Sequence, residues 1–261
     1  MRRVLFVAAF SACTFAQLPA PNAAGVEFGH IHLRVHDGKA QFKVWQDVFA
    51  PEMKKKGPMQ VLQVPGIYII ISAGETNGAS EGSAINHIGF AVKDLAAAKA
   101  KLKSDKIPFK EGKSKDHVPQ IFAIFPEGIG IEITEDKNLA TPVAFTHVHL
   151  AAVDPEAETA WYVKHFGAMA TVRHDLPAAV IPSGEIDVLK TQMPQAPTKN
   201  RPLDHMSFEV KNLEEFCKGL QADGVKFNFE YHDIEQLHLK VAFLTDPAGA
   251  FIELTEGITP E

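Results

Sequence analysis

The chain has 261 residues, of which 46% are hydrophobic and 22% are charged, and its formal net charge is −6. This composition is typical of a globular protein with one large domain or two of ordinary size. The mild acidity, and the lack of any Lys/Arg-rich run beyond Lys54–Lys56, argue against a nucleic-acid partner.

The first element is an apolar segment that follows two basic residues. Arg2 and Arg3 precede the uncharged run 4–16, which is too short to span a bilayer. We predict that residues 1–20 are a secretory signal, with Ala16 as the last residue before the cleavage site, and that the product is periplasmic or secreted. Cys13, in a sequence close to a bacterial lipoprotein box, makes lipid anchoring the alternative. No later apolar run approaches membrane length, so we expect no stable membrane insertion.

Four similar strand-like segments are spread evenly along the rest of the chain. They read HIHLRV, HIGFAV, HVHLAA and HMSFEV, and they start at His30, His87, His147 and His205. The intervals are 57 residues (30 to 87), 60 (87 to 147) and 58 (147 to 205). Evenly spaced similarity of this kind indicates a repeated supersecondary unit.

The residues between these starts also follow one pattern. Helical spacing follows each start, at residues 37–55, 94–107, 154–168 and 212–225. In the third of these helices, Asp154 is the expected N-cap and Gly167 marks the end. Strand-like runs come next, such as 120–125 and 130–135 in the second unit. Each unit therefore reads as strand, helix and three strands, a βαβββ module.

A single unit is too small to bury both faces of its own sheet, so we expect the units to pair. The expected pairs are the first unit with the second and the third with the fourth. This gives an α+β fold with one domain at residues 26–135 and another at residues 143–257. The polar stretch 136–144 would link them.

Glu253 raises the question of function, because it lies in a strand-like run between Ile252 and Leu254. A carboxylate is rarely taken out of water unless it is paired or bound to a metal. Glu132 is its equivalent in the second unit, and in the third unit either Asp187 or Val188 takes this place.

Each half of the chain thus supplies two histidines that start strands and one glutamate in a last strand. The expected metal-ligand sets are His30, His87 and Glu132 in the first half, and His147, His205 and Glu253 in the second. Two histidines and one carboxylate on one side of a metal leave positions free for substrate and for oxygen or water. Such a set suits Fe(II) best, with Mn, Zn, Ni and Co as further candidates.

Two further histidine pairs recur at equivalent positions and are candidates for catalysis. His32 and His149 follow the first ligand of their strands by two residues, hence on the same face. His117 and His238 each precede the equivalent glutamate by fifteen residues. A histidine near a metal-bound substrate can transfer protons. Structural roles for all four are the alternative.

The chain after the signal segment resembles a tandem pair of vicinal oxygen chelate domains, the superfamily of glyoxalase I, the bleomycin-resistance and fosfomycin-resistance proteins and the type I extradiol dioxygenases. The four histidine starts, the helix ending WYVKHFGA, and the endings FPEGIGIEITE and TDPAGAFIELTE carry this resemblance. It implies paired βαβββ modules whose curved sheets enclose a metal site. Such motifs are specific for the superfamily and not for one activity.

Within the superfamily the ligand pattern varies. Glyoxalase I takes one ligand from each of four strands, whereas extradiol dioxygenases lack the carboxylate of the first module in the catalytic domain. Ile70 in the first unit resembles the dioxygenase arrangement, and Asp187 keeps a four-ligand, glyoxalase-like set open in the second half. Phe122 and Phe243 stand where extradiol dioxygenases carry an active-site tyrosine, ten residues before the glutamate.

The resemblance implies a metal-dependent enzyme that acts on a small substrate with vicinal oxygens, and the signal segment predicts that this enzyme is exported. The alternative is a metal-free protein of the bleomycin-resistance type that binds and sequesters a small molecule. A homodimer is compatible with the superfamily's habit of building sites between modules, although a tandem chain provides that pairing internally.

Overall fold

The computed structural model describes residues 18–261. The predicted signal segment lies mostly outside the described residues, as does Cys13. None of the helices in the described range is both long and apolar enough to cross a membrane.

The described chain contains four βαβββ modules in sequence, as the repeat predicts. The first consists of β1 (Val26–Val35), α1 (Gly38–Phe49), β2 (Glu52–Lys56), β3 (Met59–Val64) and β4 (Ile67–Ala73). The second consists of β5 (Ile85–Val92), α2 (Leu95–Ser104), β6 (Phe109–Lys113), β7 (Pro119–Phe125), the short 3-10 helix η1 (Pro126–Gly128) and β8 (Ile129–Glu135). The third consists of β9 (Val143–Ala152), α3 (Pro155–Phe166), β10 (Met169–Arg173), β11 (Leu176–Ile181) and β12 (Gly184–Lys190). The fourth consists of β13 (Leu203–Val210), α4 (Leu213–Ala222), β14 (Phe227–Ile234), η2 (Glu235–Leu237), β15 (Leu239–Thr245) and β16 (Phe251–Glu256).

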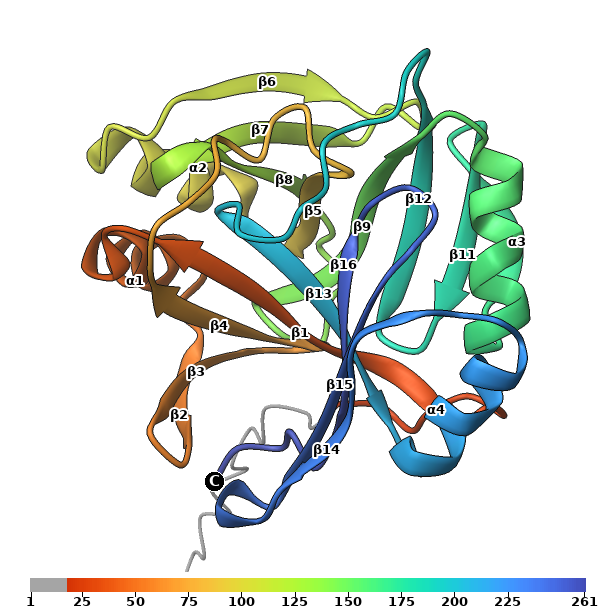
Figure 1. The fold of residues 1–261 in the computed structure, drawn as a ribbon. Helices are drawn as coiled ribbons and strands as arrows, with labels where there is room; N and C mark the ends of the chain where they lie inside the picture. The colour runs from red at the N-terminus through yellow and green to blue at the C-terminus, as the bar shows by residue number, and fades with distance from the viewer. Residues whose placement is uncertain (1–17) are drawn as a thin grey trace, which may run out of the picture.

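The modules pair across the chain, so the expected pairing within each half is wrong. One eight-stranded sheet has the order β14-β15-β16-β13-β1-β4-β3-β2 and therefore joins the first module to the fourth (Figure 1). The other has the order β10-β11-β12-β9-β5-β8-β7-β6 and joins the second module to the third. We call these the outer sheet and the inner sheet, after the position of their modules in the chain. Residues 26–135 and 143–257 therefore each contribute one module to each sheet.

The helices begin and end largely where local chemistry predicts. The Asp154 side chain accepts a hydrogen bond from the Ala157 amide at the start of α3, and Gly167 ends that helix in a left-handed conformation. The first helix is shorter than its periodicity suggests. It ends at Phe49 because Ala50 takes φ of 45° and Pro51 follows. The next five residues form β2 instead.

One face of each sheet packs into a single apolar core. The core residues of β1 are Val26, Phe28, Ile31, Leu33 and Val35, all buried. Phe28 touches Phe145 of the inner sheet, with ring centroids 5.2 Å apart, so the two sheets share this core. The opposite face of each sheet is left for polar side chains, and all the predicted ligands lie there.

Candidate metal centre

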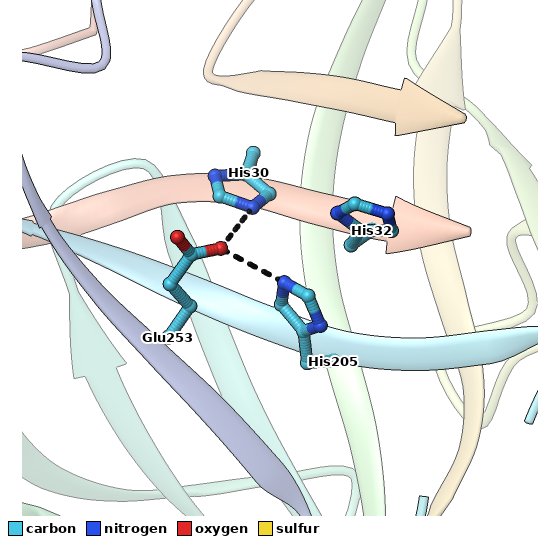
Figure 2. A group of neighbouring side chains, drawn as sticks. All are labelled: His30, His32, His205 and Glu253. Atoms are coloured by element: carbon cyan, nitrogen blue, oxygen red, sulfur yellow. Dashed lines mark hydrogen bonds and ion pairs between the residues drawn. The ribbon is translucent and has the colours of Figure 1, made fainter. Parts of the chain in front are cut away.

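Bulges in the central strands place the ligand histidines. Between the pairs Phe28↔Phe208 and Ile31↔Met206, two residues of β1 oppose the single residue Ser207 of β13. Such a bulge shifts the alternation of side chains by one residue. His30 therefore lies away from the core although it is two residues from the core residue Phe28, and His32 lies on the same face (Figure 2).

The other ligand strands contain the same irregularity. The pairing of β5 with β9 shifts beside His147 and again beside His87, and the pairing of β1 with β13 shifts beside His205. All four histidines that start the repeat thus stand at or next to a bulge. A bulge commonly re-aims a side chain beside a functional site.

The outer site consists of His30 and His32 from β1, His205 from β13 and Glu253 from β16. One oxygen of Glu253, Oε2, lies 3.0 Å from Nε2 of His30 and 3.0 Å from Nε2 of His205 (Figure 2). His32 lies beside them, with its ring 4.6 Å from that of His205, and its Nε2 is 2.8 Å from Oγ of Ser72.

The inner site consists of His147 and His149 from β9, His87 from β5 and Glu132 from β8. Glu132 Oε2 lies 3.2 Å from Nε2 of His87 and 3.7 Å from Nε2 of His147. The ring of His149 stacks on that of His87 with centroids 4.3 Å apart. A cavity of about 480 Å³ opens onto this site and is lined by Glu132, His87 and His149, with Gln120 and Lys113 among its other residues.

The structure brings all six predicted ligands into sites, but in different combinations. Glu253 meets His30 and His205, not His147 and His205, and Glu132 meets His87 and His147, not His30 and His87. The expected trios are wrong because the first module pairs with the fourth and the second with the third.

The ligand histidines have their second ring nitrogen occupied by a neighbour. In the outer site, Nδ1 of His205 lies 2.6 Å from Oδ1 of Asp204, and Nδ1 of His30 lies 2.7 Å from Oγ of Ser207. Such a contact orients the ring and leaves Nε2 free for a metal.

The inner site uses different neighbours for the same purpose. Nδ1 of His87 lies 2.8 Å from Oδ1 of Asn86, and Nδ1 of His147 lies 2.9 Å from Oγ1 of Thr146. These supporting residues were not predicted from the sequence. The available signal was a polar residue directly before three of the four ligand histidines, at Asn86, Thr146 and Asp204.

Charge and burial fix the protonation of the outer site without a metal. Burial lowers the pKa of His205, but Asp204 and Glu253 outweigh burial and raise that pKa to about 9. Burial raises the pKa of Glu253, but the hydrogen bond from His205 and the close approach of His30 hold it well below its usual range. Burial lowers the pKa of His30. Glu253 is therefore a carboxylate, and His205 carries the compensating proton.

The inner site has a similar carboxylate. Burial raises the pKa of Glu132, but the nearby ring of His147 and the hydrogen bond with His87 hold it well below its usual range. Burial lowers the pKa of His147, and it lowers the pKa of His149 to about 2. These two imidazoles are neutral, which is the form that binds a metal or accepts a proton.

The donor atoms fit a divalent metal in each site. In each group of four residues, the candidate ligand atoms lie within 4.8 Å of one another. Nε2 of His30 and Nε2 of His147 are buried without a hydrogen-bond partner; His30 approaches Glu253 closely but not along a hydrogen-bond direction. A buried nitrogen of this kind is costly unless something binds it.

Asp187 does not join the inner site. It accepts a hydrogen bond from Nη1 of Arg173, and its Oδ2 lies 3.6 Å from Nε2 of His149. Asp187 pairs with His149 in the sheet register as Ile70 pairs with His32, so Asp187 and Ile70 are equivalent. The carboxylate that a four-ligand set would use is therefore held by an arginine.

His117 and His238 do not belong to either group of site residues. Both are exposed, and both take left-handed backbone conformations in the turns before β7 and β15, with φ of 61° and 47°. The expectation that they contribute to catalysis is not supported by their positions. The equal spacing that suggested it reflects equivalent turns in the repeat.

Comparison with known proteins shows what the second half of the chain is similar to. Residues 144–254 match the family model described as the Glyoxalase/Bleomycin resistance protein/Dioxygenase superfamily. Comparison with curated proteins gives no match.

Solved structures show the same fold over nearly the whole chain. Glyoxalase I from Zea mays superposes with a TM-score of 0.72 at 14% identity, covering 89% of this chain and 92% of that chain. The "putative dioxygenase" from Bacillus subtilis superposes with a TM-score of 0.69 at 13% identity, covering 90% of this chain and 86% of that chain. The chain therefore has the tandem, four-module fold of these structures, and its residues 144–254 match the model of the superfamily.

Proposed function

We propose that the protein is a metal-dependent enzyme of the glyoxalase and extradiol dioxygenase kind, which acts on a small substrate with vicinal oxygens. The observation that carries this proposal is the convergence of two imidazole Nε2 atoms and one carboxylate at each of two buried places, among donor atoms within 4.8 Å of one another. Two of those Nε2 atoms, in His30 and His147, have no hydrogen-bond partner.

The ligands in this proposal are His30, His205 and Glu253 in the outer site, and His87, His147 and Glu132 in the inner site. Two imidazoles and one carboxylate suit Fe(II) best, and Mn, Zn, Ni and Co also accept such a set. A bound divalent metal would polarise the vicinal oxygens of the substrate and stabilise the negative charge that develops on them.

The residues beside the ligands would contact the substrate. His149 has a buried Nδ1 without a hydrogen-bond partner, and its low pKa keeps the ring neutral, so it would accept a hydrogen bond, and not the proton itself, from a substrate held next to His87. His32 has the equivalent place in the outer site but contacts Ser72. Phe122 lies opposite Glu132 in the sheet register and offers no hydroxyl, which favours isomerase or lyase chemistry over ring cleavage.

Export is a further part of the proposal. Leu18 packs on the apolar cluster of the outer sheet, and Asn22 donates to the carbonyl of Phe166 at the end of α3, over 2.9 Å. Both residues follow the candidate cleavage site after Ala16, so cleavage there would leave these contacts in the mature protein. N-terminal sequencing of protein recovered from its native host tests this.

Metal content tests the enzyme proposal. We expect two equivalents of metal per chain, measured by elemental analysis after purification without chelators. Glu132→Gln and Glu253→Gln keep the size of the side chain and remove the charge, so each should lose one equivalent and the double variant both. A parent protein without metal would instead support a metal-free binding protein. Metal that all three variants retain would refute the ligand assignment.

A further inference from the structure

The two sites differ at one pair of equivalent positions. Gly130 precedes Glu132 by two residues on β8, as Phe251 precedes Glu253 on β16. Both positions lie against a ligand histidine. A Cβ at Gly130 would be 3.0 Å from Cβ of His87, and the ring of Phe251 lies 5.7 Å from that of His205. Residue 130 thus sends no side chain into the space beside its ligand histidine, whereas residue 251 places an aromatic ring there.

Beside the inner site this space is a groove of about 630 Å³. Apolar side chains form much of its lining, including Phe109, Phe122 and Ile124. Ile124 is 47% exposed and Phe122 is 36% exposed, which is high for large apolar residues on the functional face of a sheet. His87 and Phe122 also line the cavity over Glu132, so the groove leads directly to the proposed metal.

In the outer sheet the corresponding space is filled. Phe251 is only 7% exposed and stacks on Phe243, with ring centroids 5.2 Å apart and an interplanar angle of 18°. Nζ of Lys199 lies 4.8 Å from the centre of the Phe251 ring on its face. The ring and the cation together occupy the place that Gly130 leaves open.

The C-terminal segment fills the rest of the outer sheet's polar face. Ile258 is 1% exposed and joins Tyr68, Ile70, Leu239 and Val241 in a small apolar cluster. The Gly257 amide donates to Oε1 of Glu209 over 2.6 Å, and the Glu261 amide donates to the Lys55 carbonyl over 2.9 Å. The chain therefore ends between the β2–β3 and β14–β15 hairpins (Figure 1).

We propose that substrate binds at the inner site alone, and that it carries an apolar arm, alkyl or aryl, next to its vicinal oxygens. The arm lies along Phe122 and Ile124, where Gly130 leaves room. A groove of this size is within the usual range for small-molecule sites of roughly 300–1,000 Å³. The outer site then holds metal without admitting such a substrate. This inference rests on the proposed function.

Two hydroxamates separate the arm from the chelating group. Acetohydroxamate and octanohydroxamate both offer two vicinal oxygens to a metal and differ only in the alkyl chain. Titration calorimetry on the full chain loaded with Mn(II) should show one equivalent of octanohydroxamate per chain. Its affinity should exceed that of acetohydroxamate by roughly tenfold or more, because each buried methylene contributes about 0.8 kcal/mol.

A matched pair of variants locates the arm. Ile124→Asp places a charge in the groove and leaves the ligands unchanged, so the advantage of octanohydroxamate should disappear while acetohydroxamate binding and Mn(II) content persist. Thr245 is exposed and pairs with Phe251 as Ile124 pairs with Gly130, so it is the equivalent position in the outer sheet. Thr245→Asp should leave both affinities unchanged.

The outcomes separate this inference from the proposed function. If Mn(II) does not bind, both are wrong. If Mn(II) binds but octanohydroxamate has no advantage, binds twice per chain, or is equally tight in Ile124→Asp, only the assignment of substrate to the inner groove is overturned.

Discussion

Gly89 lies against the ring of His147 so closely that a Cβ on residue 89 would be 2.1 Å from Cε1 of that ring. Position 89 is equivalent to Ser207, since each follows its ligand histidine by two residues. In the outer site the glycine and the hydroxyl residue change places. Oγ of Ser207 contacts Nδ1 of His30, and a Cβ on Gly29 would be 2.6 Å from that Oγ. The hydroxyl comes from Thr146, on the strand of His147, in the inner site and from Ser207, on the strand opposite His30, in the outer site. The position equivalent to each of these two residues is a glycine in the other site, Gly29 and Gly89.

This reciprocal arrangement predicts a specific failure and a rescue. Gly89→Ser should displace His147 and reduce metal content from two equivalents to one, although serine is the natural residue at the equivalent outer position. The double variant Gly89→Ser/Thr146→Gly reproduces the outer arrangement and should recover part of the lost equivalent. Elemental analysis of both variants, with circular dichroism as the control for folding, measures this. Full metal content in Gly89→Ser alone would contradict it.

The raised pKa of His205 predicts a pH-dependent stability of the metal-free protein. The folded-state pKa is about 9, above the ordinary value of 6.5, so the protonated ring stabilises the fold. That contribution is fully present below about pH 6.5 and is lost as pH rises through about 9, up to roughly 3 kcal/mol. Thermal unfolding in chelator between pH 6 and pH 9.5 measures the loss.

Asp204→Asn supplies the control for this pH dependence, because Asn86 is the natural counterpart in the inner site. Without the Asp204 charge the folded-state pKa of His205 falls, so the decline should be smaller and should be complete at a lower pH. A melting temperature that does not fall between pH 6.5 and 9 in the parent would contradict the protonated state of His205.

Asp187 should matter for stability and not for metal binding. Asp187→Ile copies Ile70 of the outer sheet but leaves the guanidinium of Arg173, which is 24% exposed, with Glu185 at 3.4 Å as its remaining carboxylate. Because Arg173 keeps some contact with water, we expect a loss of about 2 kcal/mol, below the usual cost of breaking a fully buried pair. Urea unfolding measures it.

The double variant Arg173→Met/Asp187→Ile removes both charges and should regain most of that stability. Metal content should stay at two equivalents in Asp187→Asn. A loss of inner-site metal in that variant would indicate that Asp187 is a metal ligand after all.

Cleavage of the linker should not separate the two halves of the chain. Each sheet contains strands from both halves, so residues 26–135 and 143–257 share two sets of backbone hydrogen bonds and one core. A protease site introduced in residues 136–142 should yield two fragments that co-elute in gel filtration until denaturant is added. Fragments that separate in native buffer would refute the pairing of modules between the two halves of the chain.

Much of the fold was predictable from the sequence because each module repeats the same local pattern. The period of two in Phe251–Glu256 placed Glu253 opposite Ile252 and Leu254, and the capping residues of α3 marked its ends. These features depend on neighbours in the chain. The six ligand residues were identifiable for the same reason.

The choice of partner module depends on contacts between distant residues and could not be predicted in this way. A first-module strand with two histidines can pair equally well, by local pattern, with either strand that carries one histidine and a nearby glutamate. The register of Phe28 with Phe208, and the bulge opposite Ser207, decide it in favour of the fourth module. Likewise, only the folded structure shows that Arg173 holds Asp187.

The pairing of the first module with the fourth, and of the second with the third, also determines the order in which the protein can fold. The middle modules are neighbours in the sequence, so β5 and β9 can pair as soon as both have been synthesised. In contrast, β1 pairs with β13, and Phe28 meets Phe208 at a sequence separation of 180 residues (28 to 208). Contacts of such separation form slowly because a long loop must close first. Until the last module arrives, one edge of β1 lacks its partner, and unpaired strand edges favour association with other chains. The first module is thus the part of this protein that most needs protection during its synthesis.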